Sequence, residues 1–201
     1  AYHPRTDLTP ITLIARNPFA LVVTAGLPVR NLAELIEYAK RNPVSYASSG
    51  VGTTTHFVSE LFKLRAGIDI EHVPYRGTAQ LQADLLAGRV QMAFDAVSAV
   101  LPNIRGGGLR AIGVATARRT PLAPEIPTLD ELGLAGFAGG GWVGVLGPAG
   151  LPPELAAKLE ADFRAAMAAG VGEELARRGF DPVGSSAAEF RTFIAEEAAR
   201  W

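Results

Sequence analysis

Short apolar runs alternate along the chain with stretches in which apolar residues recur every three or four positions. The runs are rich in Val, Ile and Phe and predict buried strands, whereas the periodic stretches predict amphipathic helices. We expect strands at residues 11–15, 20–24, 44–48, 68–73, 90–94, 109–115 and 142–146. We expect helices at 32–41, 53–66, 78–87, 96–104, 128–132, 153–169, 173–178 and after 186. This alternation predicts α/β layers and a largely parallel sheet.

Local signals refine several of these boundaries. Asn31 is expected to cap the first helix with Glu34 at the reciprocal position, and Ser186 and Glu189 repeat that spacing. Asn17-Pro18 predicts a turn between the first two strands. The apolar residues expected on buried helix faces are Leu32, Leu35, Ile36, Ala39, Phe57, Leu61, Phe62, Leu64, Leu81, Leu85, Leu86, Leu155, Leu159, Phe163, Phe190, Phe193 and Ile194.

Composition excludes several classes of protein. The chain has 201 residues, 48% hydrophobic and 19% charged, so it can bury a core and is not a disordered chain. A net charge of −1 disfavours a nucleic-acid binder. The absence of cysteine excludes disulfides and thiol chemistry. The longest uncharged run is rich in glycine and proline, so we expect no membrane insertion. A signal peptide is either absent from the chain or was removed.

The loop at residues 48–54 carries the most chemical information. It places Ser48, Ser49, Gly50, Thr53 and Thr54 between a strand and a helix. The free N–H groups at a helix start attract an anion, and the hydroxyl groups add donors. The loop lacks the lysine of a Walker motif and the third glycine of a dinucleotide motif, so a carboxylate fits better than a nucleotide. An ordinary tight turn before a helix, with a capping threonine, explains the pattern equally well.

Two further signals fall at the same level of the predicted sheet. Gly77 allows close backbone approach, and Thr78 can cap the next helix while offering a hydroxyl group. Arg76 can pair with a carboxylate, although a solvated arginine is the simpler interpretation. Asp95 ends an apolar strand, where it can accept hydrogen bonds from a ligand or cap the following helix.

Catalytic and metal-binding patterns are weak. His3, His56 and His72 are expected to be structural, and no histidine pair or carboxylate cluster indicates a metal. Ser49, His56 and Asp95 are conceivable as a hydrolase or isomerase site, but no nucleophile elbow supports them. We therefore expect no catalytic residues, no metal and no cofactor.

An ordered set of motifs resembles the Bug-type periplasmic solute-binding proteins, which are the extracytoplasmic receptors of tripartite tricarboxylate transporters. The resemblance covers essentially the whole chain. Its motifs, in order, are Tyr46-Ala47-Ser48-Ser49-Gly50, Gly52-Thr53, Val73-Pro74-Tyr75-Arg76-Gly77, Phe94-Asp95, Leu109-Arg110-Ala111-Ile112-Gly113-Val114, Arg118-Arg119, Pro124-Glu125-Ile126-Pro127-Thr128, Gly147-Pro148-Ala149-Gly150 and Pro182-Val183-Gly184-Ser185.

The resemblance implies a type II periplasmic-binding-protein fold, in which two α/β lobes clamp a small carboxylate. It implies a non-enzymatic periplasmic receptor that works with membrane permease subunits. Residues 26–133 would form lobe 2, with residues 1–25 and 134–201 as parts of lobe 1. The ligand-facing edge would comprise residues 48–54, 77–78 and 95. Lobe 1 would be incomplete, since the resemblance implies a preceding segment in other members.

A second hypothesis is the effector-binding domain of a LysR-type transcriptional regulator. Such domains share the two-lobed fold and a similar length. A DNA-binding helix-turn-helix encoded ahead of the chain would favour that hypothesis over a receptor.

Overall fold

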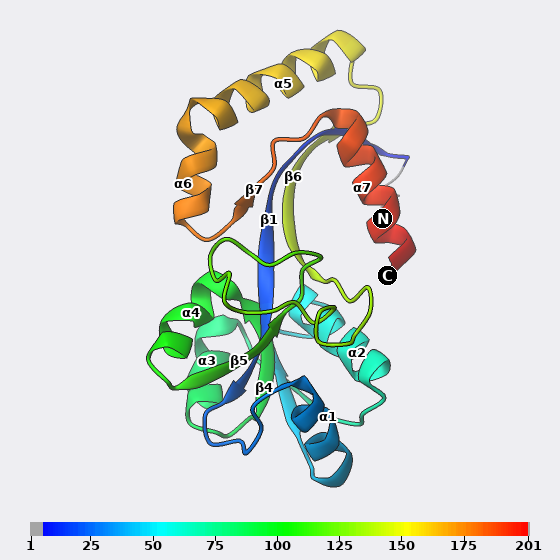
Figure 1. The fold of residues 1–201 in the computed structure, drawn as a ribbon. Helices are drawn as coiled ribbons and strands as arrows, with labels where there is room; N and C mark the ends of the chain where they lie inside the picture. The colour runs from blue at the N-terminus through cyan, green and yellow to red at the C-terminus, as the bar shows by residue number, and fades with distance from the viewer. Residues whose placement is uncertain (1–5, 201) are drawn as a thin grey trace. The chain divides into compact units, whose positions relative to one another are not determined.

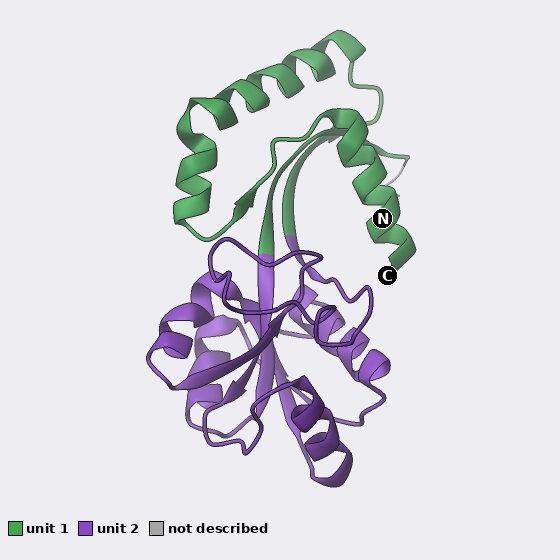
Figure 2. Cartoon of the chain, in the orientation of Figure 1, with its two compact units in different colours: residues 1–17, 142–201 green, residues 18–141 purple. Residues whose placement is uncertain are grey.

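The computed structural model describes residues 6–200, so His3 lies outside the described residues. The chain divides into two compact units, one of residues 18–141 and one of residues 1–17 with 142–201 (Figure 2). Strands β1 (Leu8–Thr24) and β6 (Gly140–Pro148) each continue from one unit into the other. The lobe boundaries expected from the sequence remain predictions beside these observed units.

The unit of residues 18–141 is built on a mixed sheet in the order β3-β2-β4-β1-β5. Its other strands are β2 (Ser45–Ser48), β3 (Glu71–Pro74), β4 (Met92–Ala96) and β5 (Leu109–Val114). Strands β1, β4 and β5 of this sheet are labelled in Figure 1. β2 pairs in parallel with both β3 and β4. β1 runs antiparallel to β4 and β5, so it is the strand that departs from the largely parallel sheet expected.

Alternate residues of the strands supply two hydrophobic cores, one on each face of this sheet. Phe19 and Leu21 of β1 belong to one core, and Ala20 and Val22 to the other. This division follows from the two-residue period of a strand. Helices α1 (Leu32–Arg41) and α2 (Thr54–Ala66) pack on the first core, while α3 (Thr78–Leu86) and α4 (Val97–Arg105) pack on the second. The sheet is therefore covered by helices on both faces.

The other unit carries the helices near the end of the chain. They are α5 (Pro153–Ala166), the π-turn η1 (Met167–Val171), α6 (Gly172–Arg177) and α7 (Ala187–Arg200), with the short strand β7 (Asp181–Pro182) pairing with β1. Phe190 of α7 is fully buried, and its ring lies 5.7 Å from that of Trp142. Helix α7 begins as expected, because the Glu189 N–H donates to the Ser186 hydroxyl and the Glu189 carboxylate accepts from the Ser186 N–H.

The predicted turn at Asn17-Pro18 is wrong, because β1 is one strand of 17 residues. Ala15 and Arg16 pair with β7, whereas the pairs with β4 and β5 begin at Phe19 and Ala20. The proline thus falls where β1 changes partners between the two units. Proline is tolerated in a strand where no ladder hydrogen bond is required of its nitrogen.

Other differences concern helix faces. Phe57, Leu64 and Leu86 are 52%, 77% and 42% exposed, and so do not lie on the buried faces predicted for them. Helix α2 is buried instead along Thr55, Val58, Ser59 and Phe62. Helix α5 has no buried residue, and Leu155 is 44% exposed. Residues 129–133 form turns instead of a short helix.

Candidate functional site

Three helices begin at the same edge of the sheet in the unit of residues 18–141. β2, β3 and β4 run in parallel, and each is followed directly by α2, α3 or α4. The N-cap positions of these helices are Thr53, Gly77 and Ala96, and none of them makes a side-chain cap hydrogen bond. The first turns therefore direct N–H groups without side-chain caps toward the carboxyl edge of the sheet, where an anion is favoured.

The loop after β2 is held by its own hydroxyl groups. The Ser48 side chain is buried, and its Oγ lies 3.2 Å from the Gly50 nitrogen. The Thr53 hydroxyl donates to the Gly50 carbonyl at 2.7 Å, so Thr53 occupies the predicted cap position but does not cap α2 with its side chain. Ser49 is half-buried, and Thr54 is the exposed first residue of α2. Gly50 has φ +137°, a conformation that favours glycine.

The loop after β3 lies beside the first loop in the fold. The Tyr75 N–H donates to the Ser48 carbonyl at 2.9 Å, which links the two loops. Thr78 is the exposed first residue of α3 and not its cap, because Gly77, with φ +109°, occupies the N-cap position. Arg76 is exposed. The structure thus brings residues 48–54 and residues 77–78 to one edge of the sheet.

Asp95 brings a buried carboxylate to the same edge. It is 2% exposed, and its two oxygens accept hydrogen bonds from the Gln82 side chain at 2.9 Å and the Ala96 N–H at 2.8 Å. Desolvation raises the pKa of Asp95, and these two hydrogen bonds only partly oppose that rise. Asp95 is not the N-cap of α4 that the alternative interpretation predicted, because Ala96 occupies that position.

Sequence reasoning missed two residues that support this edge. The buried Thr55 hydroxyl accepts from the Ser49 N–H at 3.0 Å and lies 3.0 Å from the Thr53 hydroxyl. The run of three threonines was the available signal for Thr55. Gln82 follows the buried Leu81 directly in α3 and so lies beside the buried face of that helix, which was the available signal for its contact with Asp95.

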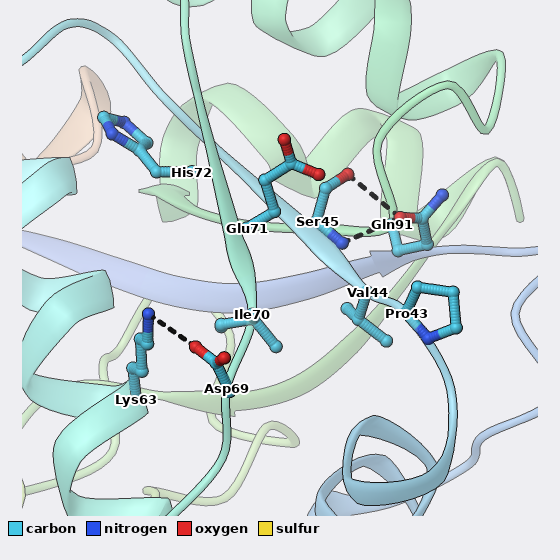
Figure 3. A pocket seen from close by; sticks show the side chains of 9 residues that line it. All are labelled: Pro43, Val44, Ser45, Lys63, Asp69, Ile70, Glu71, His72 and Gln91. Atoms are coloured by element: carbon cyan, nitrogen blue, oxygen red, sulfur yellow. Dashed lines mark hydrogen bonds and ion pairs between the residues drawn. The ribbon is translucent and has the colours of Figure 1, made fainter.

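A separate hollow of about 750 Å³ lies at the opposite ends of the strands (Figure 3). Pro43, Val44, Ser45, Lys63, Asp69, Ile70, Glu71, His72 and Gln91 line it. None of the predicted ligand residues is among them. Lys63 pairs with Asp69 at 2.9 Å, and Ser45 Oγ lies 3.0 Å from Gln91 Oε1. The hollow therefore contains none of the predicted ligand residues, although its lining residue His72 contacts Ser48 of the candidate loop.

Residues 6–200 contain neither a helix suited to span a membrane nor a cluster suited to hold a metal ion. No helix in this range is long and apolar enough to cross a membrane. No group of three or more histidine, aspartate or glutamate side chains in this range is placed to hold a metal ion.

Comparisons with known proteins match the chain along its length. Residues 1–201 match the family model described as "Tripartite tricarboxylate transporter family receptor". Protein BugT of Bordetella pertussis is 34% identical over 203 residues, which are 100% of this chain and 62% of that protein. The chain thus spans about three-fifths of the length of such curated relatives.

Solved structures agree with this match. A protein of R. palustris solved with adipate is 37% identical, with a TM-score of 0.85 over 100% of this chain and 68% of that one. MatC from Rhodopseudomonas palustris with bound malate is 29% identical, with a TM-score of 0.83 over 100% of this chain and 70% of that one. The likeness confirms the α/β fold of periplasmic binding proteins expected from the sequence.

Proposed function

Because the chain belongs to the receptor family of tripartite tricarboxylate transporters, we propose that it binds a small carboxylate at the carboxyl edge of its β2-β3-β4 strands. The single observation that carries this proposal is the common edge at which α2, α3 and α4 begin without side-chain caps. Backbone N–H groups and hydroxyl groups hold the anion, so the protein requires no basic surface, in keeping with its net charge of −1.

The residues of the proposed site are those predicted from the sequence. Some of these residues contribute backbone N–H groups to the proposed site, and others contribute side-chain groups. Ser48, Ser49, Gly50, Thr53 and Thr54 form the first loop, Gly77 and Thr78 the second, and Asp95 faces the same edge. We propose that Asp95 accepts a hydrogen bond from a hydroxyl group, an ammonium group or a water molecule bound with the ligand. A carboxylate at this position would repel a second anionic group placed beside it.

The wider role follows the family. We propose that the protein is a periplasmic receptor without catalytic activity, and that it delivers its ligand to membrane permease subunits. The relatives solved with adipate and malate support a carboxylate as the ligand class. The contacts of Ser49 and His56 support binding without catalysis. The Ser49 hydroxyl group contacts Thr55, and His56 Nδ1 accepts from the Gly52 N–H, so these contacts do not pair Ser49 with His56 as a nucleophile and its base. Membership of this receptor family favours a receptor over the alternative hypothesis, an effector-binding domain of a LysR-type regulator.

Removal of single N–H groups tests the proposal directly. Thr54→Pro and Thr78→Pro each delete one N–H, together with the threonine hydroxyl group, at the first position of a helix, where proline is tolerated. Thr54→Ala and Thr78→Ala delete the hydroxyl group alone and so separate the two effects. Ala187→Pro deletes one N–H at the start of α7 and is the matched control. Each hydrogen bond to a charged group that is lost is expected to weaken binding roughly ten- to a hundredfold.

The measurement is isothermal titration with adipate, with malate and with adipamide, the uncharged analogue of adipate. We expect the two acids to bind and adipamide not to bind. Thr54→Pro and Thr78→Pro should weaken binding, and Ala187→Pro should leave it unchanged. Equal binding of adipate and adipamide, or unaltered affinity in both loop variants, would show that the helix N-termini do not hold a carboxylate.

A further inference from the structure

Three aromatic rings form a stacked column beside the loop that follows β2. The rings of Tyr46 and His72 lie 4.8 Å apart at 14°, and those of His72 and His56 lie 4.2 Å apart at 18°. Tyr46 belongs to β2, His72 to β3 and His56 to α2, so three elements contribute one ring each. Tyr46 is fully buried, and its hydroxyl donates to the Glu60 carboxylate.

Each imidazole makes a hydrogen bond to one end of this loop. His72 Nε2 lies 2.6 Å from the hydroxyl oxygen of Ser48. His56 Nδ1 accepts a hydrogen bond from the Gly52 N–H at 3.2 Å. The Ser48 Oγ in turn lies 3.2 Å from the Gly50 nitrogen. The column thus contacts the loop at two positions, Ser48 and Gly52.

The hydrogen bond at Gly52 requires an uncharged His56 ring. A backbone N–H can donate to His56 Nδ1 only while that nitrogen keeps its lone pair, and an imidazolium has none. Two imidazolium rings stacked at 4.2 Å would also repel each other. Protonation of the column therefore removes the hydrogen bond at Gly52 and disfavours the stack that places His72 against Ser48.

Charged and titratable groups from two elements act on or contact His72: His56 and Glu60 of α2, and Tyr46 of β2. Lys63, Asp69 and Glu71 line the same hollow as His72. The Lys63 and Asp69 side chains pair with each other. Burial lowers the pKa of His72 from its ordinary 6.5, the neighbouring His56 lowers it further, and Glu60 opposes both effects. The neutral imidazole is thus the favoured form of His72 near neutral pH.

We propose that His56 and His72 are positioning residues that hold the loop in its binding form while both are uncharged, so that acidification releases the loop. This proposal rests on the proposed function only in assigning the loop to carboxylate binding. The coupling between the imidazoles and the loop is a property of the ligand-free chain. It can therefore be measured without a ligand.

The first test follows the loop amides by ¹⁵N NMR of the ligand-free chain between pH 7.5 and 5.0. We expect the chemical shift of the Gly52 amide, whose N–H donates to His56 Nδ1, to change over this pH range. Its hydrogen exchange, corrected for intrinsic rates, should rise about two- to tenfold, as loss of one hydrogen bond predicts. A Gly52 amide whose shift and exchange rate do not change between pH 7.5 and 5.0 would overturn the proposal.

Conservative variants separate positioning from a merely structural role. His56→Asn keeps an acceptor at the Nδ1 position but cannot be protonated, so Gly52 should stay protected at every pH. His56→Leu lacks the acceptor, so Gly52 should be unprotected at every pH. His72→Gln should remove the pH response at Ser48 and Gly50. A pH response at Gly52 that persists in His56→Asn would contradict the assignment.

The second test measures adipate affinity at pH 7.5 and 5.5 in the wild type and in the His56→Asn/His72→Gln double variant. Protonation of adipate and of Asp95 is common to both proteins and cancels in the comparison. The wild type should lose about two- to tenfold more affinity on acidification than the double variant. Equal losses would overturn the proposal. Failure of adipate and malate to bind at either pH would overturn the proposed function, while the NMR result would still decide the coupling.

Discussion

Asp95, a residue of the proposed site, is buried at a cost to stability. Its carboxylate is 2% exposed and has two hydrogen-bond donors, Gln82 and the Ala96 N–H. Desolvation nevertheless dominates and raises its pKa. The folded state therefore binds a proton more readily than the unfolded state does. Stability is lost as pH rises from about 3.8 through the higher pKa of the folded protein.

Asp95→Asn should relieve this loss. The amide oxygen can still accept from the Ala96 N–H, and no buried charge forms at neutral pH. We expect the free energy of unfolding of the variant, minus that of the wild type, to increase between pH 4 and pH 7. Urea denaturation at both pH values measures this difference, with Asp69→Asn as the exposed control. A difference that stays constant or shrinks would contradict the buried-charge argument.

A close approach between Gly144 and Phe190 allows a second test with a single residue. A Cβ atom on Gly144 would lie 2.2 Å from Cζ of the fully buried Phe190 ring. Gly144→Ala should therefore destabilise the protein by about 1–3 kcal/mol, the usual range for overpacking. Gly26→Ala is the matched control, because a Cβ there meets nothing within 4 Å. Denaturation followed by circular dichroism compares them, and equal effects would exclude overpacking as the cause.

At the scale of elements, helix α1 is the clearest case of local signals that agree with the structure. The Asn31 side chain accepts from the Glu34 N–H at 2.9 Å, and the helix ends before Asn42. Asn31→Ala should cost about 1 kcal/mol of stability. Asn31→Ser keeps an acceptor and should recover most of the loss. Chemical denaturation measures both variants, and similar losses in the two would show that the cap hydrogen bond is not the cause.

The elements that sequence patterns mispredict depend on tertiary contacts. β1 continues through Asn17-Pro18 because partners from two units flank that position, which a local turn signal cannot reveal. Phe57 and Leu64 fit a helical apolar stripe, yet the face of α2 that packs on the sheet also carries the polar Thr55 and Ser59. The hydroxyl group of Ser59 donates to the Thr55 carbonyl within the helix. Because that satisfies the hydroxyl group, this face can be buried.

At the scale of the whole molecule, the candidate site joins segments that are distant in sequence. Ser48, Gly77 and Asp95 meet at one edge because β2 pairs in parallel with both β3 and β4. Each loop could be predicted from its own residues, and parallel pairing predicts a shared edge. The hydrogen bond from Tyr75 to the Ser48 carbonyl and the contact of His72 with Ser48 required the fold itself. Those links carry the proposed dependence of the loop on pH.

Stability of the whole chain on acidification combines groups with opposite signs. The pKa of His72 is lowered in the folded state, so its contribution is present above about 6.5 and is lost as pH falls through its lower folded value. Asp84, Glu131, Glu174 and Glu189 also have lowered pKa values, with hydrogen bonds as the first cause in each case. Their contributions are lost at lower pH, below about 4.5. Asp95 acts in the opposite sense, because protonation relieves its buried charge.

Two windows of acid destabilisation should therefore be separable. In an Asp95→Asn background, adding His72→Gln should reduce the loss of stability between pH 7 and 5 and leave the loss below pH 4.5 unchanged. Glu174→Gln should reduce only the loss of stability below pH 4.5, because Glu174 pairs with Arg177 and Arg178 on the surface. Added salt should reduce the loss of stability below pH 4.5 more than the loss between pH 7 and 5, because salt screens exposed ion pairs and does not screen a desolvation effect. Urea denaturation across pH, at low and high salt, measures the free energy of unfolding in both pH ranges. If salt changes the loss of stability between pH 7 and 5, surface charge controls that loss and burial of His72 does not.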